Sequence, residues 1–61
     1  MDILITKRRN FAYIIGTSDK GRNYLFEHYT LTSQNLLQVG VDLAEEIATN
    51  LTNAGLVVDL K

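Results

Sequence analysis

The pattern of apolar and polar positions divides the chain into a strand-like first half and a helix-like second half. Between Leu31 and Gly55, apolar side chains recur at helical spacing and gather on one broad arc, while polar side chains occupy the rest of the circumference. An arc of this width suits a helix that lies across a sheet. The arc consists of Leu36, Leu37, Gly40, Val41, Leu43, Ala44, Ile47, Ala48, Leu51 and Ala54.

Each end of this predicted helix has its own signal. Thr32 is a candidate N-cap, with Ser33 as the alternative. At the other end Gly55 can adopt the left-handed conformation, and Leu56 can then contact Leu51 as in a Schellman ending. We therefore predict one helix between these two signals.

The first half of the chain predicts strands. Residues 2–6 alternate loosely, and they form either a separate strand or the frayed start of one. Residues 11–16 are rich in aromatic and β-branched side chains and predict a strand clearly. The polar residues 7–10 between them are either a turn or a polar stretch of one long edge strand. One face of the second strand carries Phe11, Tyr13 and Ile15.

Residues 17–22 give the strongest turn signal in the chain. Gly21 can supply a positive φ there, and Ser18 can hydrogen-bond to nearby backbone groups. We therefore predict a β-hairpin whose return strand covers residues 23–30. A short strand over residues 56–61 follows the helix.

The predicted order is β-β-α-β, with one more strand if residues 2–6 stand alone. We expect an α+β fold, a small two-layer unit in which one helix packs across an antiparallel sheet of three or four strands. The sheet face away from the helix would be partly open, with Ile14, Leu25 and Tyr29 among its apolar members. That face, or the exposed sheet edge, is a candidate contact surface.

Length and composition bound these expectations. Sixty-one residues make one domain, and a chain of this size buries only about 60% of the surface that its unfolded form exposes. Because small domains often need a partner for stability, we expect a homodimer. The chain has no cysteine, no apolar run long enough to span a membrane, and an acidic residue where a signal peptide has basic ones. We expect a cytoplasmic protein.

Charge is unevenly distributed although the net charge is only −1. Residues 1–26 contain five basic and two acidic residues, whereas residues 27–61 contain one basic and five acidic residues. The basic run 7–9 adjoins aromatic residues, and basic residues next to aromatic ones can hold a nucleic-acid strand by phosphate contacts and base stacking. We favour an ordinary solvated sheet edge as the explanation of this run, because the net charge is slightly acidic. The candidate nucleic-acid residues are Lys7, Arg8, Arg9, Tyr13, Lys20 and Arg22.

The predicted helix carries the opposite charge. Its polar side holds an acidic group with no lysine or arginine among the helix residues to offset it. Such a group can pair with the basic hairpin within a dimer, or with a basic surface on another protein. The candidate protein-binding residues are Val39, Asp42, Glu45 and Glu46.

No residue pattern indicates catalysis. His28 is the only histidine, and its neighbour Glu27 would point to the opposite face of the predicted strand. One histidine, no cysteine and scattered carboxylates argue against a metal site. The glycine-containing segment 16–21 lacks the spacing of a phosphate-binding loop. We therefore expect no enzyme activity, no metal and no cofactor.

The layout is similar to that of several very small virus-encoded proteins that block a host enzyme, among them inhibitors of RNA polymerase and of uracil-DNA glycosylase. The similarity lies in the order of elements, in a Leu-Thr-Ser helix entry and in an aromatic strand with Tyr24, Phe26 and Tyr29. We expect a small non-enzymatic protein-binding module of the phage or mobile-element type that binds and inhibits a host protein. The alternative is a nucleic-acid-binding module that uses the basic N-terminal hairpin.

Overall fold

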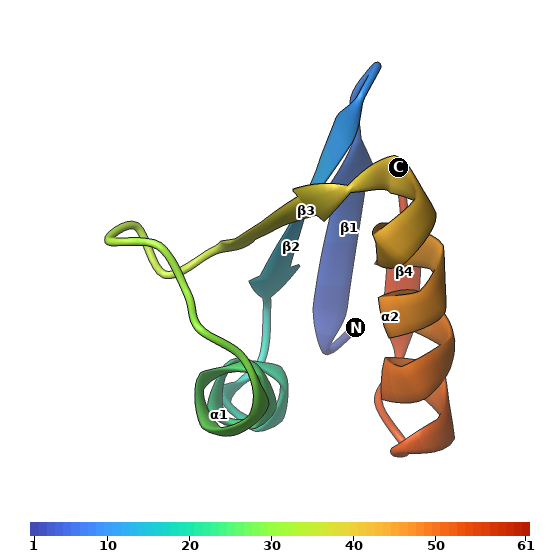
Figure 1. Ribbon diagram of the computed structural model, residues 1–61. Coiled ribbons are helices and arrows are strands. Elements are labelled where there is room, and N and C mark those ends of the chain that lie inside the picture. Colours follow the sequence, from blue (N-terminus) through green and yellow to red (C-terminus); the bar gives the residue numbers. More distant parts are fainter.

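The computed structural model describes residues 1–61 and shows an α+β fold with two layers, a four-stranded sheet and two helices (Figure 1). The predicted α+β class is confirmed, but the predicted β-β-α-β order and the single helix are wrong. The elements along the chain are β1 (Ile3–Lys7), β2 (Phe11–Gly16), α1 (Asp19–His28), β3 (Leu37–Gly40), α2 (Val41–Asn53) and β4 (Val58–Leu60).

The sheet has the order β3-β2-β1-β4 and is mixed. β1 pairs with β2 and β2 with β3 in antiparallel fashion, but β4 pairs with β1 in parallel, so the expected purely antiparallel sheet is wrong. The reason is α2, which connects the two edge strands and crosses the sheet between them, so that β3 and β4 run in the same direction (Figure 1). Two alternatives were open for residues 2–10, and the structure has the separate first strand with a turn after it. In that turn the N–H of Arg8 donates to the carbonyl of Phe11 (2.7 Å).

The predicted hairpin over residues 17–30 is wrong, because the chain forms α1 there. Ser18 is the N-cap of this helix, and its hydroxyl oxygen accepts a hydrogen bond from the N–H of Gly21 (3.0 Å). Asp19 in the first turn adds a favourable negative charge at the N-terminal end of the helix. The polar residues that signalled a turn therefore begin a helix.

Gly21 is needed for its small size rather than for a positive φ. It is buried in α1, and a Cβ built on it would stand 2.0 Å from the carbonyl oxygen of Asp2. The start of β1 and the first turn of α1 thus meet backbone to backbone, which only glycine allows. This long-range contact is invisible in the local sequence.

Asp2 ties three parts of the chain together. Its carboxylate accepts hydrogen bonds from the hydroxyl of Ser18 (2.7 Å) and from the N–H of Val57 (2.9 Å), and its carbonyl accepts one from the N–H of Thr17 (2.8 Å). The Val57 hydrogen bond, and then the Ser18 hydrogen bond, lower the pKa of the Asp2 carboxyl from its ordinary value. The residue before β1 therefore fastens both the start of α1 and the entry to β4.

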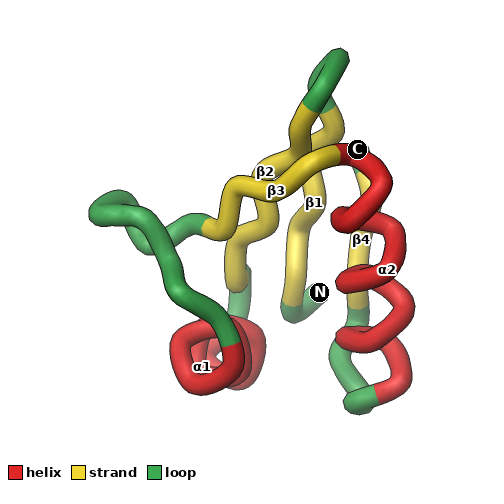
Figure 2. The backbone as a smooth tube through the Cα atoms, viewed as in Figure 1, coloured by secondary structure: helices red, strands yellow, loops and turns green.

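The long predicted helix from Leu31 is also wrong before Val41, where α2 begins. Thr32 does not cap a helix; it opens a turn in which its carbonyl accepts from the N–H of Asn35 (2.9 Å) and its own N–H donates to Leu36 (2.8 Å). Asn35 has a φ of 62°, in the left-handed region, which interrupts any helix. Figure 2 shows this connection as a loop between α1 and β3. Gly40 is the residue before α2 rather than a site within a helix.

The predicted end of that helix is confirmed in detail. Gly55 has a φ of 90°, the N–H of Leu56 donates to the carbonyl of Leu51 (3.1 Å), and the N–H of Gly55 donates to Thr52 (3.0 Å). This pair of bonds is the Schellman motif, and both leucines are buried in the core. The motif turns the chain from α2 into β4.

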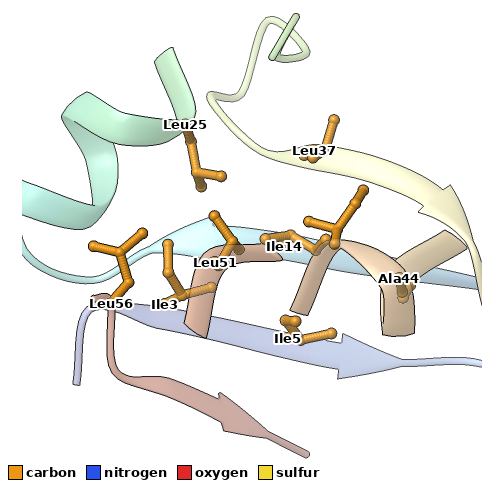
Figure 3. Packing of buried hydrophobic residues seen from close by; sticks show 10 residues of the cluster. Ile3, Ile5, Ile14, Leu25, Leu37, Ala44, Leu51 and Leu56 are labelled. Atoms are coloured by element: carbon orange, nitrogen blue, oxygen red, sulfur yellow. The ribbon is translucent and has the colours of Figure 1, made fainter. Parts of the chain in front are cut away.

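The core lies between one face of the sheet and the two helices (Figure 3). Ile14 and Leu25 belong to it, so their predicted place on the open face is wrong; Tyr29 is half-buried against the same cluster. The side chains from both layers interdigitate there, which is the main stabilising contribution available to a chain without disulfides. The buried members are Ile3, Ile5, Ala12, Ile14, Leu25, Leu37, Ala44, Ile47, Leu51 and Leu56.

Candidate functional site

The sheet face opposite the helices is the most distinctive surface of the molecule. Strand alternation places Leu4, Phe11, Tyr13 and Ile15 on this face, because their neighbours along each strand point into the core. All four are half-buried by one another and by adjacent strands, and no helix packs over them. We call this surface the open face. The prediction of a partly open sheet face is correct, but its members differ.

Cross-strand register defines how the open face is built. Tyr13 lies between Gln38 of β3 and Thr6 of β1, while Ile15 lies beside Leu4, whose other neighbour is Asp59. Phe11 lies between Gly40 and Arg8, since Arg8 donates to its carbonyl. One end of the open face is therefore aromatic and basic, and the other is aliphatic with a single acidic residue.

Lys61 joins the basic end. Its N–H donates to the carbonyl of Ile5 (2.8 Å), and its carbonyl accepts from the N–H of Lys7 (3.1 Å). Lys61 therefore lies beside Thr6, the residue between these two. Alternation from Asp59 puts Lys61 on the open face. It lies at the opposite end of the sequence from the basic hairpin and was not among the predicted residues. Only the parallel pairing of the first and last strands could have identified it.

Phe11 and Tyr13 form an aromatic pair on the open face. Their ring centroids are 5.2 Å apart, and the ring planes meet at 74°. A T-shaped pair uses the edge of one ring and one face of the other. The pair itself therefore leaves the other ring faces unused.

The two layers of the molecule carry opposite charge. The sheet layer, with its hairpin and flanking residues, holds four basic residues and two acidic ones, a net charge of +2. The helices hold two basic and five acidic residues, a net charge of −3. The slightly acidic total therefore conceals a basic sheet side. Long-range attraction of an anionic partner depends on this local field rather than on the total.

The six predicted nucleic-acid residues do not form one surface. Lys20 and Arg22 lie in α1, at the end of the sheet away from the turn between β1 and β2. There Lys20 donates to the carbonyl of Gly55 (3.1 Å), and Arg22 pairs with Asp19. Lys7 turns toward α2 and pairs with Glu45 (3.0 Å). Only Arg8, Arg9 and Tyr13 remain beside the open face, and both arginines are exposed without an ion-pair partner.

The predicted protein-binding residues are also divided. Val39 belongs to β3, where it packs partly against the core, so its predicted place on the helix is wrong. Asp42, Glu45 and Glu46 are exposed on α2 as expected. Asp42 and Glu46 have the i, i+4 spacing that puts them on the same side of the helix. Glu45 forms an ion pair with Lys7 at the end of β1, so one residue of the basic run 7–9 contacts the acidic helix.

No catalytic arrangement emerges. His28 lies in α1 rather than on a strand, and its ring stacks on Tyr24 with 4.1 Å between centroids. Burial, and then the neighbouring Tyr24 and Glu46, raise the pKa of the Tyr29 hydroxyl. No group of three or more histidine, aspartate or glutamate side chains is placed to hold a metal ion. Neither helix is long and apolar enough to span a membrane.

A shallow pocket of about 260 Å³ lies between α1 and the loop that follows it. Its charged member, Arg22, is already paired with Asp19, and the pocket holds no acid–base pair. We therefore place the candidate site on the open face instead. The pocket is lined by Gly16, Arg22, Asn23, Leu25, Phe26, Leu31 and Asn35.

Comparison with known proteins found no matching family model, no similar curated protein and no similar solved structure. Function therefore has to be inferred from the chemistry of these surfaces.

Proposed function

We propose that this chain binds single-stranded nucleic acid on its open face. The observation that carries the proposal is the aromatic pair Phe11–Tyr13 on an uncovered sheet face, with Arg8 and Lys61 on the same face. Aromatic rings on a sheet offer stacking to unpaired bases, and neighbouring basic groups attract the phosphates. The positive charge of the sheet layer supports the same partner.

The test is fluorescence anisotropy with a short labelled oligothymidine or oligouridine at low salt. Tyr13→Leu keeps an apolar side chain on the sheet but removes a stacking ring, so affinity should fall by about fivefold or more. Phe26→Leu is the matched control, because Phe26 is 77% exposed on α1 in the other layer and should leave affinity unchanged. Absence of binding by the unaltered protein at low salt overturns the proposal.

A second candidate function is protein binding through the acidic side of α2. The observation that favours it is Leu43, which is 48% exposed and lies one helical turn from Glu46. An exposed apolar residue beside two unpaired carboxylates is a plausible centre for contact with a basic protein surface. Inhibition of a host protein, as in small phage proteins, would be one use of such a contact.

Charge reversal tests this second candidate. Asp42→Lys combined with Glu46→Lys should abolish retention of any protein that the unaltered chain captures from a lysate. Glu27→Lys is the matched control, since Glu27 is an exposed acidic residue on α1. Equal capture by all three proteins contradicts a role for the α2 surface. The homodimer also stays a prediction, and sedimentation velocity measures it directly.

A further inference from the structure

The open face has an unfilled place beside Phe11. Gly40 of β3 is the cross-strand partner of Phe11, and a Cβ built on Gly40 would meet no heavy atom within 4 Å. The next partner along β3 is different, because Gln38 places a carboxamide beside Tyr13. The two aromatic rings thus have unlike neighbours, an empty space and a hydrogen-bonding group.

The backbone dihedral angles do not require glycine at position 40. Its φ of −64° and ψ of 155° are available to any residue, unlike the φ of 90° at Gly55. No packing explanation applies either, since the added Cβ would stand in open space. Gly21, in contrast, is required by the backbone of Asp2. As the N-cap of α2, Gly40 is also a more favourable residue than alanine, and its missing side chain leaves the flank of the Phe11 ring uncovered.

We infer that the place above Gly40 receives one unpaired base, which stacks on Phe11, while the next base lies on Tyr13 within reach of Gln38. This inference rests on the proposed nucleic-acid function and specifies its ligand as at least two consecutive unpaired nucleotides. The phosphates of this pair lie toward Arg8 and Lys61. A duplex is excluded, because its bases are already stacked on both faces and cannot spread across a sheet.

A size series at position 40 tests the inference. Gly40→Ala, Gly40→Val and Gly40→Leu fill the space progressively, so affinity for the oligothymidine should fall stepwise, by about fivefold or more at valine. Circular dichroism and thermal unfolding of each variant show whether the fold is retained. The unaltered protein should prefer the oligothymidine to a duplex of the same length.

A double-mutant cycle with Phe11→Leu separates a blocked stacking place from a general disturbance. If Gly40→Val acts by denying access to Phe11, the double variant should bind no more weakly than either single variant. Additive losses would contradict the inference, and so would unchanged affinity in the folded Gly40→Val and Gly40→Leu variants. In both cases the proposed function would still hold if Tyr13→Leu binds the oligothymidine more weakly than the unaltered protein. No binding by the unaltered protein would remove both.

Discussion

Gly21 and Asp2 touch backbone to backbone, with 2.0 Å between the Cβ position of Gly21 and the carbonyl oxygen of Asp2. This contact joins the first turn of α1 to the start of β1. Because the obstacle is backbone rather than a flexible side chain, a methyl group can enter only if the helix moves away from the strand.

Gly21→Ala should therefore destabilise the protein by about 3 kcal/mol, or prevent folding. Gly40→Ala is the matched control, because the same added methyl group meets nothing within 4 Å. It should cost less than about 1 kcal/mol, mainly because alanine is a poorer residue than glycine before a helix. Urea unfolding of both variants measures the difference, and equal losses would show that the contact is not tight.

Because of Asp2, the free energy of unfolding should depend on pH in the acid range. Its carboxyl pKa is lowered in the folded state relative to the ordinary value of 3.8, so the unfolded chain binds a proton more readily. The contribution is complete above that ordinary value and is lost as the pH falls through the lower folded pKa. Asp2→Asn should flatten this part of the pH–stability profile, whereas Asp59→Asn at an exposed position should leave the Asp2 contribution in place.

Leu25 should be the main anchor of α1. It is 1% exposed and is the large buried side chain of that helix, whose only other buried residue is Gly21. Leu25→Ala should cost about 2–5 kcal/mol, since truncation removes buried surface and leaves a cavity. Phe26→Ala, the next residue and largely exposed, should change the free energy of unfolding by less than about 0.5 kcal/mol. Similar losses for both would mean that α1 docks on a different face.

Arg8 should supply one phosphate contact. On the proposed function, Arg8→Gln should lower affinity for oligothymidine and reduce the slope of log K against log salt by about 0.7. Arg22→Gln removes the same charge from α1, where the arginine is paired with Asp19, and should leave the slope unchanged. An equal effect of the two variants would show that only total charge matters.

Glu45 should restrain the basic end of the sheet by holding Lys7. The side chains of this ion pair are 34% and 68% exposed, so Glu45→Gln should alter stability by no more than about 1 kcal/mol. It should raise affinity for oligothymidine about twofold, because Lys7 is released and a negative charge disappears. Asp42→Asn removes an equal charge without releasing Lys7, and a comparable gain there would show that the ion pair itself is unimportant.

Features that depend on neighbouring residues were predictable from the sequence. The Schellman ending of α2 depends only on Gly55 and the two leucines around it. Strand β2 is recognisable from its aromatic and β-branched residues. The position of α1 was not predictable in this way. Gly21 close to Ser18 is a pattern typical of a turn. Only the contact of Gly21 with the distant Asp2 explains this glycine as a helix residue, with Ser18 as the N-cap.

The candidate site was only partly predictable for the same reason. Alternation alone places Phe11 and Tyr13 together, but both faces of β2 are apolar, so the sequence does not say which one the helices cover. The identity of the basic neighbours depends on register across strands. Arg8 could be expected from its place beside Phe11, whereas Lys61 requires the parallel pairing of β4 with β1.

The parallel pairing of β4 with β1 has a consequence for the chain during its synthesis. β1 and β2 are close in sequence and can pair soon after both are synthesised, but the other edge of β1 has no partner until β4 is complete at Leu60. Leu56, which closes the core, arrives equally late. A nascent chain therefore carries an unprotected strand edge and an unsealed apolar surface until residues 56–60 have been synthesised. Stalled or shortened products should be prone to aggregation or degradation.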